Sequence, residues 1–250
     1  MFLIRFFYFL EPFIIRFMKI HDTLISGLQQ VNGETCLRLE LRGLPQLRPG
    51  QYIQISEDAE DALLPRSLML CRIDEESSLF CGEMNPAWRP GDRLRLRGPL
   101  GNGFQLPTAA RRVVLAAQAG TSLNPLLALA DQALAAGAEV VVLSDQPLAD
   151  LPAAIEVLPM EEMSAALKWA DFCGFVCAYD DLPVFTHLMI DSDSEHPKEM
   201  QVLVVTDMIC AEGAACGVCA LPTRKGWRLA CKDGPVFNYN DLDFKADAYG

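Results

Sequence analysis

Residues 210–237 read CAEGAACGVCALPTRKGWRLACKDGPVF, and this stretch determines how the C-terminal part of the chain can fold. It contains Cys210, Cys216, Cys219 and Cys231 in the spacing C-x5-C-x2-C-x11-C. Glycines and alanines around the thiols allow the backbone to approach a bound group closely. Because the segment is too short for a hydrophobic core of its own, we expect a small module organised by its ligands.

Four cysteine thiolates are the ligand set of structural zinc sites and of iron–sulfur clusters. Plant-type [2Fe-2S] sites use C-x4-C-x2-C followed by a distant cysteine, and this chain has one more residue between its first two cysteines. Zinc ribbons generally use two C-x2-C pairs, whereas this segment has one. The spacing therefore favours a [2Fe-2S] cluster. A four-cysteine zinc site and four unrelated buried thiols are the alternatives.

The other five of the nine cysteines lie scattered in apolar, strand-like runs. We expect them to be buried as small hydrophobic residues. The N-terminal sequence lacks the cleavage site of a secretory signal, so a disulfide framework is disfavoured. These five residues are Cys36, Cys71, Cys81, Cys173 and Cys177.

The formal net charge of −12 disfavours nucleic acid as a partner, because phosphate binding depends on clustered Lys and Arg. Residues 1–17, MFLIRFFYFLEPFIIRF, are apolar, but charges and Pro12 interrupt them and disfavour a membrane span. We predict an N-terminal extension over 1–17, with Met18 as the true start and a short interfacial helix as the alternative. A cytoplasmic protein is expected.

Residues 18–106 contain short alternating segments that are separated by turn residues. Examples are Tyr52–Ser56 and Leu68–Ile73, and Pro-Gly pairs stand between such segments. A two-residue period broken by turns predicts an antiparallel β-barrel.

Residues 107–205 have a different pattern, in which short apolar runs alternate with segments at helical spacing. Val113–Ala117 and Phe172–Ala178 are such runs, and Leu123–Ala136 has helical spacing. This alternation predicts an α/β domain with a parallel sheet. Residues 206–250 remain for the cysteine module.

The run from Cys216 to Phe237, and above all KDGPVF at 232–237, resembles the iron–sulfur module of electron-transfer subunits of NAD-linked dihydroorotate dehydrogenases. The resemblance extends over residues 18–240. It implies a ferredoxin-reductase-like fold, with an antiparallel FAD-binding β-barrel, a parallel-sheet NAD-binding-like domain and a small C-terminal [2Fe-2S] module. It also implies electron transfer between NAD(H), FAD and the cluster, to or from a catalytic flavoprotein partner. That partner would be dihydroorotate dehydrogenase of pyrimidine biosynthesis, in a hetero-oligomer.

The resemblance assigns candidate flavin contacts in the barrel. The family motif R-P-x-[ST] corresponds to residues 66–69, where Met69 takes the place of the hydroxyl residue. Arg66 is suited to a diphosphate, and a surface ion pair is its alternative role. The string GPLGNGF at 98–104 matches the family's G-P-L-G-x-G-F, but of the expected glycine-threonine motif only Gly82 is present. The predicted flavin contacts are Arg66, Ser67, Leu68, Gly101 and Gly103.

The nucleotide loop of the family, G-G-x-G-x-A-P-L, corresponds to AGTSLNPL at 119–126. Gly120 is retained and is predicted to face the nucleotide, whereas Ser122 replaces a glycine. The family's C-G-P is Cys177-Ala178-Tyr179 here. NAD(H) binding is therefore expected to be weak, altered or lost.

No catalytic acid or base is expected, because His21, His187 and His196 belong to no catalytic constellation.

One alternative to the electron-transfer subunit is a cluster-bearing adaptor or regulatory paralogue that has lost flavin or NAD binding. Another is a subunit of a different oxidoreductase, such as sulfide dehydrogenase or ferredoxin:NADP oxidoreductase. A zinc-stabilised binding module is the remaining one.

Overall fold

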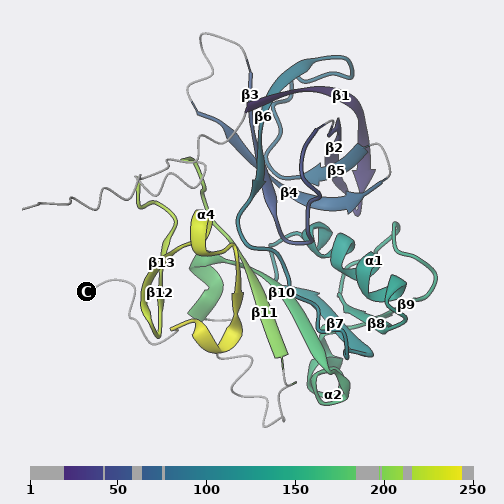
Figure 1. Ribbon diagram of the computed structural model, residues 1–250. Coiled ribbons are helices and arrows are strands. Elements are labelled where there is room, and N and C mark those ends of the chain that lie inside the picture. Colours follow the sequence, from purple (N-terminus) through teal and green to yellow (C-terminus); the bar gives the residue numbers. More distant parts are fainter. Residues whose placement is uncertain are drawn as a thin grey trace, which may run out of the picture.

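The computed structural model of the 250-residue chain describes residues 20–41, 43–57, 64–74, 77–183, 197, 199–210 and 216–243. The predicted N-terminal extension, residues 1–17, lies outside the described residues. Figure 1 shows a barrel, an α/β layer packed against it and a third small unit, coloured yellow, beside both. None of the helices in the described part of the chain is long and apolar enough to cross a membrane.

The barrel is a closed antiparallel sheet with the strand order β1-β2-β5-β4-β3-β6. Along the last strand, exposed Arg93 and Arg95 alternate with buried Leu94 and Leu96, because successive side chains of a strand point to opposite faces. The prediction of an antiparallel barrel is confirmed. Its strands are β1 (Ile20–Val31), β2 (Glu34–Glu40), β3 (Tyr52–Ser56), β4 (Arg66–Ile73), β5 (Ser77–Cys81) and β6 (Arg93–Leu100).

The second sheet has the order β14-β11-β10-β7-β8-β9, and its strands from β7 to β11 run parallel, as predicted. The segment expected to be helical begins with a 3₁₀ turn at Asn124, and Pro125 stands in this first turn, where its missing amide is not needed. The elements are β7 (Arg112–Ala117), η1 (Asn124–Leu126), α1 (Leu127–Ala135), β8 (Glu139–Leu143), β9 (Ile155–Leu158), η2 (Met160–Glu162), α2 (Met163–Trp169), β10 (Phe172–Ala178), η3 (Tyr179–Asp181) and β11 (Glu199–Val205).

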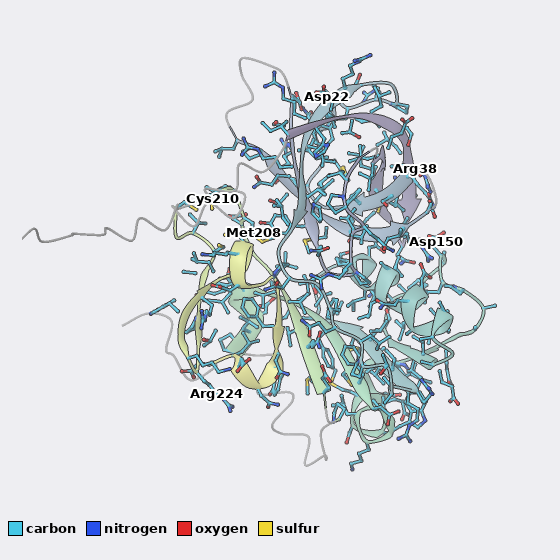
Figure 2. The ribbon with its side chains drawn as sticks, viewed as in Figure 1. Asp22, Arg38, Asp150, Met208, Cys210 and Arg224 are labelled. Atoms are coloured by element: carbon cyan, nitrogen blue, oxygen red, sulfur yellow. The ribbon has the colours of Figure 1, made fainter. Side chains whose placement is uncertain are left out.

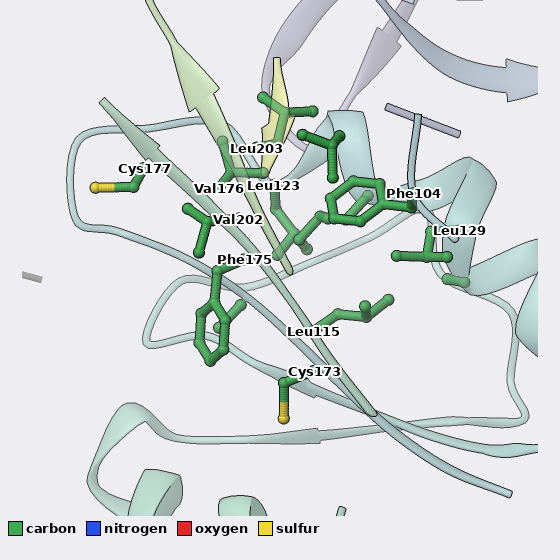
Figure 3. Close-up of a cluster of buried hydrophobic side chains, with 14 of the residues drawn as sticks. Phe104, Leu115, Leu123, Leu129, Cys173, Phe175, Val176, Cys177, Val202 and Leu203 are labelled. Carbon is green, nitrogen blue, oxygen red and sulfur yellow. The ribbon is translucent and has the colours of Figure 1, made fainter. Parts of the chain in front are cut away.

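The larger hydrophobic core lies between this sheet, helix α1 and the segment that follows the barrel (Figure 3). Leu115 from β7, Leu129 from α1 and Phe104 from the domain junction meet there. A Cβ atom on Gly174 of β10 would lie 2.9 Å from Leu129 Cδ2 and 3.0 Å from Leu115 Cδ2. The glycine therefore allows the helix to pack directly on the sheet.

The C-terminal segment is attached to the α/β sheet. Strand β14 pairs antiparallel with β11, and Val202 lies opposite Phe237. The buried side chains of Leu221 and Val236 belong to the same core as the sheet. Strand pairing and apolar packing therefore hold this module to the sheet, and its organisation by ligands stays a prediction. Its elements are β12 (Ala220–Thr223), β13 (Gly226–Leu229), α4 (Ala230–Asp233), β14 (Val236–Asn238) and η4 (Tyr239–Asp241).

Candidate cluster and nucleotide site

Three of the four cysteines in the C-terminal segment converge. The Sγ atoms of Cys210 and Cys231 are 3.8 Å apart, and the backbone N–H of Cys231 donates to Cys219 Sγ at 3.4 Å. Cys231 and Cys219 are buried, whereas Cys216 is exposed on the connecting loop. Burial, reinforced by the neighbouring thiols of Cys219 and Cys210, raises the pKa of Cys231. The arrangement offers soft ligands at the border between the protein interior and its surface.

The sulfur geometry can be compared with thiolate metal sites. Two thiolates bound at about 2.3 Å to one tetrahedral metal are separated by about 3.8 Å, which matches the separation of Cys210 and Cys231. In the described part of the chain, no group of three or more His, Cys, Asp or Glu residues is arranged to hold a metal ion. Two thiolates at the separation of Cys210 and Cys231 fit one iron of a two-iron cluster and equally a zinc ion. The cysteine spacing, and not this distance, favours the cluster.

The barrel holds the chain just before Cys210 by two hydrogen bonds to the carbonyl oxygen of Met208. Met208 and Cys210 are labelled in Figure 2. Gln54 Nε2 donates to the carbonyl oxygen of Met208 at 2.5 Å, and Ser67 Oγ donates to the same oxygen at 2.7 Å. Gln54 is buried, and its Oε1 has no partner among the described residues. Strands β3 and β4 thus fix the start of the cysteine segment.

The same face of β3 also reaches the last cysteine. The hydroxyl of Tyr52, which is fully buried, donates to the carbonyl oxygen of Cys231 at 3.2 Å. Tyr52 and Gln54 are two positions apart, so their side chains leave the strand on one face. One barrel strand therefore supports the backbone at both ends of the thiol cluster.

The junction after the barrel packs against the residues that follow Cys231. The N–H of Asn102 donates to the carbonyl of Gly234 at 2.5 Å, and Asn102 Nδ2 donates to the carbonyl of Asp233 at 2.9 Å. Gly101 has a φ of +70°, and a Cβ there would lie 2.5 Å from Pro235 Cδ. This close approach requires glycine.

A cleft of about 570 Å³ lies between the barrel and the α/β sheet. The barrel contributes the apolar side chains of Met69 and Met84, and the sheet side contributes Gly120 and Ser122. Of the described residues that line this cleft, Glu34 alone carries a formal charge. The lining is mainly apolar and suits a planar ring system better than a bare anion.

The predicted flavin contacts lie in different surroundings. Arg66 forms an ion pair with Glu83 at 2.9 Å, beside the cleft-lining Gly82 and Met84. Leu68 is buried in the smaller core inside the barrel. Ser67 bonds Met208, Gly101 and Gly103 pack against backbone, and Gly120 lines the cleft. Their contacts with a flavin or a nucleotide stay predictions.

Glu34 is a residue that sequence reasoning missed. Its Oε2 accepts hydrogen bonds from Ser122 Oγ at 2.7 Å and from Asn124 Nδ2 at 3.0 Å. Asn32 Nδ2 donates to Asn124 Oδ1 at 2.9 Å. Asn32 and Gly33 have positive φ angles of 47° and 82°, as expected for the tight Asn-Gly turn between β1 and β2. The Asn-Gly pair is a sequence signal for this hairpin, but not for its contact.

The five remaining cysteines are buried, as predicted: Cys36, Cys71, Cys81, Cys173 and Cys177. Burial raises the pKa of Cys177 to about 12. Of the three histidines, His187 and His196 lie outside the described residues.

Comparisons with known proteins agree with this architecture. Residues 206–243 match the family model described as the iron–sulfur cluster binding domain of dihydroorotate dehydrogenase B. The electron transfer subunit of dihydroorotate dehydrogenase B (NAD(+)) from Geobacillus thermodenitrificans is 36% identical, over 78% of this chain and 86% of that protein. The subunit of the same name from Bacillus caldolyticus is 34% identical, over 86% of this chain and 95% of that protein.

A solved structure shares the fold. It is a chain of an NADH-dependent reduced ferredoxin-NADP oxidoreductase, a structure that was described for its insights into flavin-based electron bifurcation. The TM-score is 0.71 at 16% identity, over 89% of this chain and 90% of that one. The structural likeness confirms the ferredoxin-reductase-like fold, and the sequence likeness is much closer to the dehydrogenase subunits. The chain belongs to the family of dihydroorotate dehydrogenase B electron transfer subunits.

Proposed function

We propose that this chain passes electrons between NAD(H), FAD and a [2Fe-2S] cluster, to or from a catalytic flavoprotein partner. The partner is dihydroorotate dehydrogenase, in a hetero-oligomer that serves pyrimidine biosynthesis in the cytoplasm. The observation that carries the proposal is the convergence of Cys210, Cys219 and Cys231 in a segment that matches an iron–sulfur domain. The identification of dihydroorotate dehydrogenase as the partner is supported by the chain's membership of a family of NAD-linked electron transfer subunits.

Cys210, Cys216, Cys219 and Cys231 would hold the cluster. The N–H of Cys231 donates to Cys219 Sγ, and such bonds stabilise negative charge on a ligating sulfur. The exposed position of Cys216 would bring one side of the cluster to the surface, where a partner can approach. The chain thus sets the distance and orientation of the cluster relative to the groups that exchange electrons with it, and this transfer needs no catalytic acid or base.

The cleft between the barrel and the sheet would hold the flavin ring. Its apolar lining fits the ring, and Arg66 would bind the diphosphate at the rim. The present partner of Arg66 is Glu83, whose side chain is 89% exposed, so the ion pair costs little to exchange. Hydride acceptance and one-electron transfer are the chemistry that a flavin supplies when bound.

The domain limits follow from these roles. Residues 18–106 would form the flavin domain, 107–205 the nucleotide domain and 206–250 the cluster module. Gly120 would face the nucleotide, since it lines the cleft in the loop that precedes helix α1. Helix N-termini of this kind attract phosphate groups.

The test is anaerobic purification of the full chain, followed by quantification of iron, sulfide, zinc and released flavin in one sample. About two irons, two sulfides and one FAD per chain are expected for a [2Fe-2S] flavoprotein. Bleaching by NADH would show that electrons enter from the nucleotide. Dihydroorotate-dependent reduction after mixing with a dihydroorotate dehydrogenase catalytic subunit would show that they enter from the partner. Zinc without sulfide would exclude the cluster.

A cluster-bearing adaptor without flavin is the second candidate. It is favoured by Met69, which lines the cleft where the family has a hydroxyl, and by Ser122 in the nucleotide loop. Cluster absorption without released flavin, in protein expressed with riboflavin in excess, would favour the adaptor. A flavin content near one per chain would exclude it.

A further inference from the structure

The β1–β2 hairpin of the barrel reaches across to the nucleotide loop. Ser122 Oγ and Asn124 Nδ2 both donate to Glu34 Oε2, at 2.7 and 3.0 Å. Asn124 is 1% exposed, and its Nδ2 also donates to the carbonyl of Val31 at 3.0 Å. The carboxylate of Glu34 is therefore held in a fixed place by the loop.

That place is the start of a helix. Asn124 opens the turn η1, which continues into α1 up to Ala135. The first amides of a helix and its dipole attract negative charge. The chain itself supplies such a charge through Glu34, whose oxygen bonds side chains of the loop and of the first helical turn.

Inside the described part of the cleft no cation balances Glu34, and Arg66 at the rim is paired with Glu83. The cleft's described lining contains neither Lys nor Arg, and Glu34 lines it together with Met69 and Met84. A pyridine dinucleotide brings a diphosphate with two negative charges. Repulsion from the fixed carboxylate of Glu34 would weaken the binding of a diphosphate that enters this partly desolvated cleft.

We propose that Glu34 is a specificity-determining residue that takes the place of a nucleotide phosphate at the loop and lowers the affinity of the cleft for pyridine dinucleotides. The inference rests on the proposed function, because it assumes that NAD(H) enters this cleft. It adds a cause for weak binding that is separate from the loss of loop glycines. Electrons would then enter from NADH only at high nucleotide concentration.

The experiment compares full-length wild-type protein with Glu34→Gln. Glutamine keeps the shape and the acceptor oxygen for Ser122 and Asn124, and it removes the charge. Glu34→Asp keeps the charge, and Glu156→Gln removes a charge from an exposed position on β9, away from the cleft. Binding of 1,4,5,6-tetrahydro-NADH, which has the diphosphate but transfers no hydride, is measured by calorimetry. Thermal melting checks that all variants are folded.

We expect Glu34→Gln to bind the analogue about tenfold more tightly than wild type, as removal of a nearby like charge predicts. Glu34→Asp and Glu156→Gln should stay within about threefold of wild type. Reduced nicotinamide riboside, which is uncharged and lacks the diphosphate, should bind all four proteins alike. A measurable wild-type affinity that Glu34→Gln leaves unchanged overturns the inference and leaves the proposed function intact. Absence of binding in every protein overturns both the inference and the NAD(H) part of the proposed function.

Discussion

Replacing Gly101 with alanine tests whether the barrel and the cysteine segment are packed directly against each other. An added Cβ would lie 2.5 Å from Pro235 Cδ and 2.6 Å from the carbonyl oxygen of Gly234. The positive φ angle costs about 1–2 kcal/mol for a residue with a side chain, and overpacking adds about 1–3 kcal/mol. We expect Gly101→Ala to lower the free energy of unfolding by about 3 kcal/mol.

Gly137→Ala is the matched control. Gly137 follows helix α1 with a φ of +76°, and an added Cβ would meet no atom within 4 Å. Only conformational strain remains, offset in part by the lower entropy of the unfolded chain, and the expected cost is about 1 kcal/mol. The difference between the two variants therefore isolates the contact with Gly234 and Pro235.

The assay is thermal and urea unfolding, followed by circular dichroism on preparations with equal iron and flavin content. In a chain of this size, 1 kcal/mol corresponds to roughly 2–4 °C in melting temperature. We thus expect Gly101→Ala to melt roughly 6–12 °C below wild type, and Gly137→Ala roughly 2–4 °C below it. Equal losses in the two variants would refute the reasoning, because the junction would then accept a side chain without resistance.

Three further results are expected. Tyr52→Phe removes the hydroxyl that donates to the carbonyl of Cys231. The substitution should lower the free energy of unfolding by about 1–2 kcal/mol and alter the electron paramagnetic resonance spectrum of the reduced cluster. An unchanged spectrum would argue against a role of Tyr52 in positioning the cluster. Cys231→Ser should lower iron and sulfide below half of the wild-type content, whereas Cys173→Ala should retain both, as colorimetric assays on folded protein can establish. Burial raises the pKa of Cys177 from its ordinary value of 9.0 to about 12. The contribution of this buried thiol to the stability of the folded state is therefore fully present below pH 9 and declines as the pH rises toward 12. At pH 8, iodoacetamide should therefore label Cys216 in cluster-free protein and spare Cys177, and the reverse order in peptide mapping would contradict this.

The sequence allowed the two sheets to be predicted because their signals are local. Arg93–Leu96 alternates with the period of a strand, and Phe172–Ala178 is a continuous apolar run of the kind that parallel sheets bury. The four candidate ligand cysteines were chosen from their spacing and from the KDGPVF string, and their role as cluster ligands stays a prediction. Short or polar strands gave weaker signals, and Ile155–Leu158, which has two exposed residues, was not predicted.

The contacts that assemble the site have no local signal. Tyr52 bonds a residue 179 positions away, and Gln54 bonds one 154 positions away. Glu34 stands 88 positions from Ser122. Such pairs exist only once the barrel has docked on its neighbours, so no periodicity or spacing within a strand could indicate them. The Asn32-Gly33 pair is a sequence signal for a hairpin turn, a signal that the prediction did not use, and nothing in the sequence indicates the loop that this hairpin contacts.

The pairing of β14 with β11 has a consequence for protein synthesis and for truncation. Residues 236–238 follow β11 by more than thirty positions, so the edge of β11 stays open until the ribosome has also made β14. An open, apolar edge strand is a site of aggregation. A truncated protein that ends at residue 205 would expose that edge at Val202 permanently. Cysteine substitution is therefore the cleaner way to obtain a cluster-free flavoprotein, because it leaves the sheet closed.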